Sequence, residues 1–217
     1  MTQRPVNIIT VEREYGSHGG EFAHDLAERL GWRHMDSELV AGAAHMAGVD
    51  PELAARMDER QDPWYYRYGK AFWMDPIYAT AGPTEDQIFD SERMLTLIRQ
   101  EILDTAKVGN CVLVGRGAAC ALAGHPGCFH IFVYATSRAK RDWYARTFPD
   151  QAEHAEQHLV AHDKRRATMI RKFYQQDWCS RSLYHMLINS CIGIEAMIAT
   201  VEAATGLAAC APQSATH

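Results

Sequence analysis

The chain has 217 residues and a mass of 24.4 kDa, a length that suggests one domain with an insertion, or at most one large and one small unit. Hydrophobic residues make up 47% of it and charged residues 23%, which is the composition of a globular protein and excludes a disordered or fibrous one. Lys and Arg number 22 against 27 Asp and Glu, so the net charge is −5 and gives no electrostatic basis for non-specific nucleic-acid binding.

The spacing of the six cysteines and the first residues of the sequence bear on the cellular compartment of the protein. None of the cysteines forms a Cys-x-x-Cys pair, so the sequence has no paired-cysteine zinc spacing. The start, MTQRPVNIIT, lacks the apolar stretch of a signal peptide, and no stretch of about 20 continuous apolar residues is present for a membrane helix. We therefore expect a cytoplasmic protein with reduced thiols and no membrane partner.

The first elements predicted are a strand, a glycine-rich loop and a helix. Residues Val6–Val11 are a short β-branched run, the pattern of a buried strand. The turn Tyr15–Gly20 follows it, and Glu21–Leu30 then has apolar residues at helical spacing up to Gly31, which ends the helix. A strand, glycine loop and helix in this order are typical of the opening of an α/β nucleotide-binding unit.

The next segment is harder to assign. We expect a short strand at Trp32–Met35 and helix in residues 37–58, with a break near 48–51. Residues 58–86 are dense in aromatic residues and prolines. They are interpreted as an insertion that packs on the body of the protein or on a second subunit, which allows a homodimer. The alternative is a wall or cap over a substrate pocket.

The rest of the chain alternates helices and strands. Amphipathic or charged helices are predicted at residues 85–106, 137–148, 152–173 and 192–204, and strands at 112–114, 130–134 and 184–189. This alternation predicts an α/β fold, with a parallel sheet and helices on both of its faces.

The glycine-rich loop is a candidate anion site. Backbone N–H groups converge at such a loop, and the helix N-terminus carries about half a positive charge. In the usual phosphate-loop pattern a lysine reaches the phosphates and a hydroxyl holds Mg²⁺, but here Gly19 and Glu21 occupy those positions. Arg13 is the nearest cation that could replace the lysine. The alternative is a tight strand–helix turn with a carboxylate that suits the helix dipole.

Six motifs in order resemble the cytidylate kinase-like family, the relatives of cytidylate kinase. The resemblance covers about residues 6–201, and its motifs are ITVEREYGSHGGEFAHDLAERLG, HMDSELV, CVLVGRGAAC, FVYATSRAKR, HDKRRATMIRKFYQQDW and YHMLINSCIGIEAMIATV. In this family an Arg-Glu-Tyr-Gly-Ser-x-Gly-Gly segment replaces the usual phosphate loop, so the missing lysine is a family feature.

The resemblance implies a P-loop NTPase fold of the nucleoside-monophosphate-kinase type, with three α/β/α layers and a parallel sheet. It implies a single kinase-like domain over residues 1–217. Within that domain, residues 37–106 would form a helical and aromatic insertion on the acceptor side, and residues 150–175 an arginine-rich helical lid.

The resemblance also implies an activity and a set of site residues. The activity is phosphoryl transfer from ATP, with Mg²⁺, to a nucleoside monophosphate, most closely CMP or dCMP. The loop residues Gly16, Ser17, His18, Gly19, Gly20 and Glu21 would bind ATP, Asp36, Ser37 and Arg116 would bind the acceptor, and Arg13, Arg116, Arg165, Arg166 and Arg171 would act on the phosphoryl group.

Each of these assignments has an alternative. Arg116 could form a structural ion pair, Asp36 could cap a helix, and the charges of residues 164–172 could form a solvated helix face. Asp163 could hold a lid arginine or have no role. Where cytidylate kinases have an aspartate after the arginine, this chain has Gly117, which departs from their base-recognition pattern. The rival functions are a kinase for another small acceptor and a nucleotide-binding protein without turnover.

Three histidines share the spacing of a metal-binding helix face. His154, His158 and His162 lie four residues apart on the predicted helix 152–173. Imidazoles at this spacing can chelate a metal, but no cysteine or carboxylate completes the set. We expect exposed histidines here and predict no metal site.

Overall fold

The computed structural model describes residues 5–36 and 85–207, with side chains described from residue 95 onward in the second range. The chain divides into two compact units, one formed by residues 1–35 with 106–217 and the other by residues 36–105. The helix predicted at 37–58 and almost all of the aromatic segment 58–86 lie outside the described residues.

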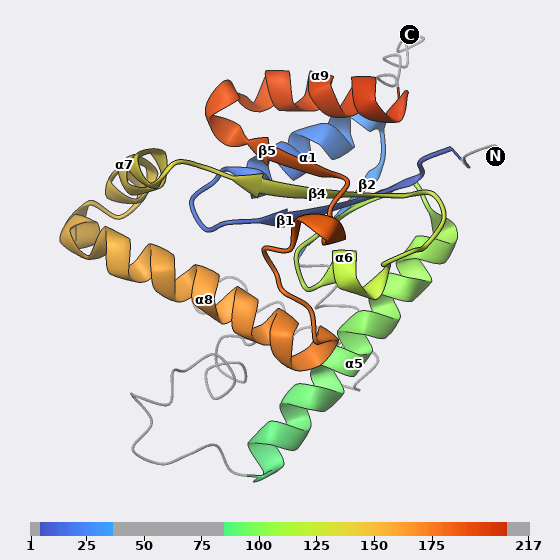
Figure 1. Cartoon of the computed structure of the whole chain (residues 1–217), viewed down its shortest axis with the longest axis horizontal. Helices are drawn as coiled ribbons and strands as arrows, with labels where there is room; N and C mark the ends of the chain where they lie inside the picture. The colour runs from blue at the N-terminus through green and yellow to red at the C-terminus, as the bar shows by residue number, and fades with distance from the viewer. Residues whose placement is uncertain (1–4, 37–84, 208–217) are drawn as a thin grey trace, which may run out of the picture. The chain divides into compact units, whose positions relative to one another are not determined.

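The first unit is built on a five-stranded parallel sheet (Figure 1). Its strands, in the spatial order β2-β3-β1-β4-β5, are β1 (Ile8–Arg13), β2 (Arg33–Met35), β3 (Cys111–Val114), β4 (Cys128–Tyr134) and β5 (Met186–Asn189). All four neighbouring pairs are parallel. The central strand β1 pairs its Ile8 with Cys111 on one side and Cys128 on the other. The apolar runs of β1 and β3 are buried because helices cover both faces of the sheet.

The helices follow the labels of Figure 1. They are α1 (Gly19–Leu30), α5 (Glu85–Val108), α6 (Ala118–Ala121), α7 (Ser137–Thr147), α8 (Ala155–Tyr174) and α9 (Ile194–Thr205), with single 3₁₀ turns η1 (Pro149–His154), η2 (Arg181–Leu183) and η3 (Ser190–Ile192). Among the helices that the structure describes, none is both long and apolar enough to span a bilayer.

Helices α1 and α9 cover one face of the sheet (Figure 1). The residues of β1 that face them are Ile9 and Val11. The helical spacing of Phe22 and Leu26 in α1 turns both side chains inward, where they are fully buried. Met197 of α9 completes the same core cluster. This alternation of strand residues decides which side chains of β1 lie on the opposite face.

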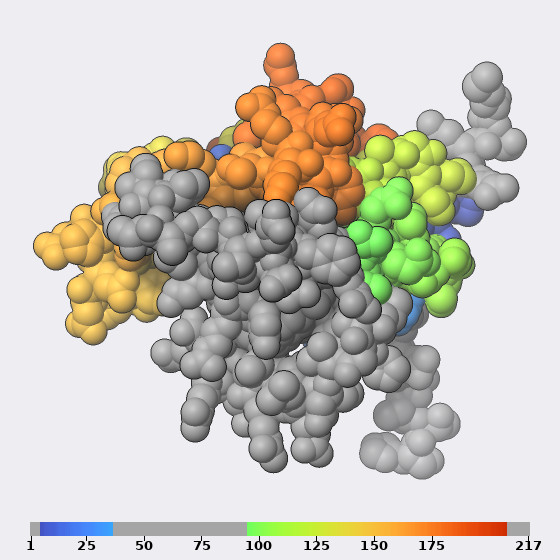
Figure 2. All heavy atoms as spheres, turned by 90° about the horizontal axis from the view of Figure 1, so that it is seen from below, coloured from blue at the N-terminus to red at the C-terminus, as the bar shows by residue number. Residues whose placement is uncertain are grey.

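The opposite face carries α6, α8 and the segment after α8. The β1 residues on this side are Ile8, Thr10 and Glu12, all buried. Trp178 follows α8 and packs edge-on against Phe132 of β4, with ring centroids 5.2 Å apart. Figure 2 shows the outside of this face, where α8 and the segment up to η2 (yellow-orange to orange) form a continuous band. Helices therefore cover both faces of the sheet, and the predicted α/β/α fold with a parallel sheet is confirmed.

The observed ends of the helices and strands differ from those that the sequence patterns predict. Each predicted strand and helix in the described part exists, with ends shifted by a few residues. The helix predicted from residue 152 begins at Ala155, because Pro149 opens a separate 3₁₀ turn. Gly31 ends α1 in a left-handed conformation, as predicted. The four-residue helix α6 was not predicted, because AACA is too short to show a period.

Replacing Phe22 with alanine tests the core under α1. This side chain is fully buried among strand residues, so its loss should lower the free energy of unfolding by about 3–5 kcal/mol. The matched control is Val160→Ala on α8, where the side chain is 56% exposed and the change should stay within about 0.5 kcal/mol. Urea unfolding measures both, and equal effects would contradict this account of the core.

Candidate active site

The phosphate-loop candidate joins the end of β1 to the start of α1. The chain turns through Gly16 and His18, which both have positive φ values of 77° and 58°. Ser17 closes the turn, because its buried hydroxyl donates to the carbonyl of Glu14 at 2.8 Å. The first N–H groups of α1 have no acceptor within the helix, so they are available to an anion.

Arg13 and Gly19 explain why this loop has no lysine. A Cβ atom on Gly19 would lie 2.5 Å from Cβ of Arg13, a distance that real atoms do not reach. The start of α1 therefore lies so close to the end of β1 that only glycine fits there. The Arg13 side chain extends from this point to Gly115, where any Cβ atom would overlap its Nη1. A guanidinium group thus lies between the loop and the turn that follows β3.

The turn after β3 consists of three residues in the left-handed region. Gly115, Arg116 and Gly117 have φ values of 66°, 57° and 73°. This conformation costs a non-glycine residue such as Arg116 about 1–2 kcal/mol. The hydrogen bonds that hold the turn include Gly115 N–H to Val11 O at 3.0 Å, Ala118 N–H to Gly115 O at 3.0 Å, Gly117 N–H to Glu12 Oε1 at 3.2 Å, and the Tyr174 hydroxyl to Arg116 O at 3.4 Å.

A steric conflict also favours glycine at position 117. A Cβ atom there would overlap the ring of Tyr174, which comes from the end of α8. Residue 117 therefore has no room for the aspartate that cytidylate kinases carry after the arginine, unless Tyr174 moves.

Arg166 brings a third guanidinium to the same place. Its Nη1 donates to the carbonyl of Arg13 at 2.6 Å, and 23% of its side chain is exposed. Burial, together with the charges of Arg13 and Arg116, lowers the pKa of Arg166 to about 10, against the opposing effect of Asp163 and Glu12. Arg166 is thus close enough to Arg13 and to Arg116 to be repelled by both. An anion bound among them would relieve that repulsion.

Asp163 fastens α8 to the loop. Its Oδ1 accepts from the backbone N–H of Tyr15 at 2.7 Å. Lys140 of α7 bridges the two segments, with Nζ 2.9 Å from Glu14 Oε2 and 3.3 Å from Asp163 Oδ2. Burial raises the pKa of Asp163, but the Tyr15 amide and the charges of Lys140 and Arg166 oppose that effect. Asp163 therefore holds the loop itself, and it lies 3.9 Å from the lid arginine Arg166.

Aromatic contacts complete the attachment of α8. The ring of Tyr15 stacks on His162, with centroids 4.0 Å apart and an angle of 9°. Trp143 of α7 meets Tyr15 edge-on at 5.3 Å and closes over Gly16, where a Cβ atom would lie 2.8 Å from its ring. Burial lowers the pKa of His162 to about 3, with the charges of nearby arginines acting in the same direction. His162 is therefore neutral in the folded protein.

The predicted row of exposed histidines is wrong for two of its members. His162 stacks on Tyr15, and His158 is hydrogen-bonded through Nδ1 to the hydroxyl of Tyr144. Only His154 is exposed, beside Glu153 at 3.3 Å. The helical spacing could not reveal this difference, because the partners of His158 and His162 come from other segments.

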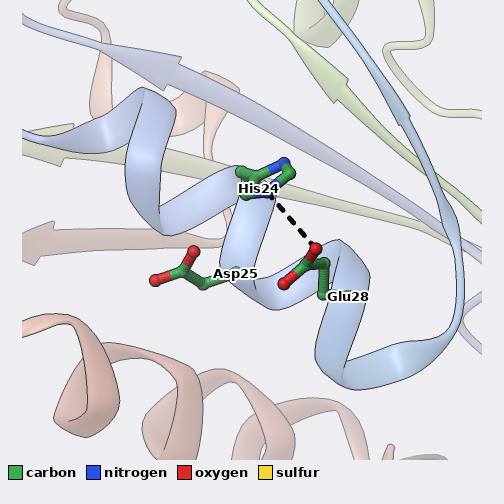
Figure 3. A group of neighbouring side chains, drawn as sticks. All are labelled: His24, Asp25 and Glu28. Carbon is green, nitrogen blue, oxygen red and sulfur yellow. Dashed lines mark ion pairs between the residues drawn. The ribbon is translucent and has the colours of Figure 1, made fainter.

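One surface group on α1 has the residue types of a metal site. Among the side chains that the structure describes, His24, Asp25 and Glu28 alone bring such ligand atoms within 4.8 Å of one another (Figure 3). His24 and Glu28 form an ion pair at 3.4 Å and are both exposed, while Asp25 projects beside them. Exposed pairs at this spacing are ordinary features of a helix surface.

The structure brings together part of the predicted site. Arg13, Arg116 and Arg166 meet beside the loop, and the predicted ATP-binding residues Gly16, Ser17, His18, Gly19, Gly20 and Glu21 form the loop and the first turn of α1. The carboxylate of Glu21 forms an exposed contact with His18 Nδ1 at 2.9 Å.

The remaining predicted residues lie elsewhere. Arg165 and Arg171 are both on α8, and Arg171 is exposed near its end. Asp36 follows β2 and opens the second unit, while Ser37 lies outside the described residues.

Sequence reasoning missed Glu12, Trp178 and Lys140. A signal for Glu12 was present: it continues the Ile8–Thr10 alternation of β1, so a charge falls on a strand face that should be buried. Trp178 and Lys140 had no comparable signal, because their partners are distant in sequence.

The fold is shared with several solved structures, one of them a shikimate kinase. An uncharacterised protein from Eubacterium ventriosum ATCC 27560 superposes with a TM-score of 0.65 at 17% identity, covering 92% of this chain and 98% of that one. TT1252 from Thermus thermophilus gives 0.55 at 14% identity, covering 93% and 98%. Shikimate kinase from Bacteroides thetaiotaomicron gives 0.50 at 14%, covering 92% and 98%. No curated protein matches the chain.

The sheet order, the loop before α1 and the arginines beside it define a P-loop kinase fold. The model of the cytidylate kinase-like family matches residues 8–191, which is most of the chain. The chain therefore belongs to the cytidylate kinase-like family, as its motifs predicted.

The neutral His162 predicts acid sensitivity. Its folded pKa of about 3 lies below its ordinary value of 6.5, so the unfolded chain binds its proton first and stability falls as the pH drops below about 6.5. His130, with a pKa lowered to about 4 by burial, adds to the loss. The variant His162→Phe keeps a ring on Tyr15 and should lose less stability between pH 7.5 and pH 5.

Thermal unfolding at the two pH values measures this difference. We expect the drop in Tm to be smaller in His162→Phe by about 4–8 °C, which corresponds to about 2 kcal/mol for a chain of this size. The control His154→Phe removes an exposed histidine from the same region and should behave like the wild type. Equal drops in all three proteins would refute the assignment of a buried, neutral His162.

Proposed function

We propose that the protein transfers the terminal phosphoryl group of ATP to a nucleoside monophosphate, with CMP or dCMP as the preferred acceptor. The observation that carries the proposal is the convergence of Arg13, Arg116 and Arg166 beside the phosphate loop. Family membership supports phosphoryl transfer as the chemistry. The choice of CMP or dCMP rests on the family likeness alone, and the cytoplasmic location is part of the proposal.

The loop fits the phosphates of ATP by its backbone and by Arg13. The N–H groups at the start of α1 would hold phosphate oxygens. Arg13 would supply the charge that a lysine supplies in other phosphate loops, because Gly19 leaves no room for a longer side chain. Mg²⁺ bound with the nucleotide would neutralise phosphate charge, and Glu21 is the carboxylate in the first turn of α1.

Arg116 is assigned to the acceptor phosphate, and Arg166 to the phosphoryl group that is transferred. In the transfer, the bond between the terminal phosphorus and its bridging oxygen breaks, ADP leaves with that oxygen, and an oxygen of the acceptor phosphate forms the new bond. Charge spreads over the three oxygens of the group in flight, and fixed positive groups stabilise it. Arg166 would contact that group, and Arg116 would hold the acceptor phosphate.

Two other functions remain candidates. A kinase for a different small acceptor would keep the loop and the arginines, and Gly117 in place of aspartate favours this possibility over strict cytidylate recognition. A nucleotide-binding protein without turnover would need the loop but no acceptor. A homodimer formed through residues 58–86 also stays a prediction, and sedimentation at tens of micromolar tests it.

The test is ADP formation from ATP and Mg²⁺ across a panel of nucleoside monophosphates, with an acceptor-free control. We expect ADP that depends on CMP or dCMP, and a loss of about 10- to 100-fold in Arg116→Ala, because a hydrogen bond to a charged group contributes about 1.5–3 kcal/mol. Arg138→Ala is the matched control, since Arg138 is 88% exposed on α7.

The other outcomes separate the candidates. Dependence on a different monophosphate would retain the chemistry and change the acceptor. Folded wild-type protein that binds ATP but forms no acceptor-dependent ADP would contradict the proposed function and favour a binding protein. Equal activity in Arg116→Ala and Arg138→Ala would remove Arg116 from the acceptor site.

A further inference from the structure

Glu12 is a buried carboxylate that the proposed reaction does not use. It is the fifth residue of β1, only 4% exposed, and on the face opposite α1. Burying a charged group is unfavourable unless hydrogen bonds compensate for lost water. Burial accordingly raises the pKa of Glu12, while the charges of Arg13 and Arg166 and two hydrogen bonds oppose the effect.

Each oxygen of Glu12 has its own donor. Oε1 accepts from the backbone N–H of Gly117 at 3.2 Å, and Oε2 accepts from the indole N–H of Trp178 at 3.2 Å. The Trp178 donor is also held from other directions. Tyr184 donates its hydroxyl to the carbonyl of Trp178 at 2.7 Å, and Phe132 packs against the indole. The carboxylate therefore links the turn after β3 to the segment after α8.

The turn that Glu12 holds is the one that carries Arg116. Arg116 adopts a left-handed conformation with φ 57° between two glycines, which is costly for an arginine. Two of the hydrogen bonds to this turn involve side chains: Glu12 accepts from the amide of Gly117, and Tyr174 donates to the carbonyl of Arg116. The bond from the Gly117 N–H to Glu12 is the shorter of the two, at 3.2 Å against 3.4 Å, and its acceptor is buried and held from a second side by the Trp178 indole.

We propose that Glu12 is a positioning residue that sets the direction of Arg116 toward the acceptor phosphate, by fixing the amide of Gly117 and anchoring it to Trp178. The proposal rests on the proposed function. Glu12 touches neither substrate in this scheme and acts only through the turn. A misplacement of about 1 Å in a group that holds a reacting partner can reduce the rate by up to about 100-fold.

The test uses Glu12→Gln. Glutamine keeps the volume, but its NH₂ group cannot accept, so one of the two N–H donors loses its partner. We expect the KM for CMP to rise by about tenfold or more, with the KM for ATP changed by less than about threefold. Trp178→Phe removes the indole N–H donor and leaves Glu12 in place. It should also raise the KM for CMP, but by less than Glu12→Gln does.

Thr10→Val is the matched control for simple loss of a buried hydrogen bond. Thr10 lies two residues earlier on the same face of β1, is fully buried, and bonds through Oγ1 to His130 Nδ1 at 2.8 Å. This variant should lower Tm about as much as Glu12→Gln and leave the KM for CMP unchanged. If Thr10→Val raises that KM equally, Glu12 has only a structural role and the proposal fails.

The double variant Glu12→Gln/Arg116→Ala tests whether Glu12 acts through Arg116. If it does, the KM for CMP of the double variant equals that of Arg116→Ala alone, because the group that Glu12 positions is already missing. If the increases in the KM for CMP of the two single variants multiply in the double variant, the proposal fails.

Hydrogen exchange at the amide of Gly117 separates this proposal from the proposed function. The amide should exchange at least about tenfold faster in Glu12→Ala, which removes both carboxyl oxygens, than in the wild type and Thr10→Val. If the wild type forms no acceptor-dependent ADP, the kinase proposal fails, and exchange alone decides whether Glu12 holds the turn. Unchanged exchange in folded Glu12→Ala would overturn the positioning role in either case.

Discussion

The close approach of α1 to the end of β1 is the constraint on which the candidate site depends. At Gly19 the two segments are so near that a Cβ atom would lie 2.5 Å from Cβ of Arg13. A lysine therefore cannot occupy the position that it has in other phosphate loops. The Arg13 side chain extends to Gly115, where a Cβ atom would displace its guanidinium group and where φ is +66°, a conformation that favours glycine. Close contacts of Arg13 thus favour glycine at both positions and accompany the replacement of a lysine by an arginine from the strand.

The concentration of positive charge then requires fixed partners. Arg166 is repelled by Arg13 and by Arg116, and without partners or an anion the three guanidinium groups would disperse into solvent. Arg166 is restrained by the carbonyl of Arg13, and Asp163 ties its helix to the amide of Tyr15. These contacts make the shape of the phosphate loop depend on α8. Helix α8, which carries Arg166, is therefore also part of the support of the loop.

Much of the fold could be predicted from local patterns. β-branched runs and helical spacing marked the strands and helices, and Gly31 marked the end of α1, because these signals depend on nearby residues. The phosphate loop and Arg116 were found from motifs. The contacts of Asp163 with Tyr15 and of Glu12 with Gly117 could not be predicted, since each joins residues more than 100 positions apart. Their pairing depends on tertiary packing, which a single sequence does not display.

The most direct test of the account is the affinity for MgATP when Arg13 is replaced. Titration calorimetry on the wild type, Arg13→Lys and Arg13→Met, with the exposed Arg138→Met as control, measures whether Arg13 supplies the missing charge. The account predicts that Arg13→Met weakens binding by about tenfold or more, that Arg13→Lys recovers part of the loss, and that the control is unchanged. Wild-type affinity in folded Arg13→Met would contradict it, because the loop would then bind phosphate without the arginine.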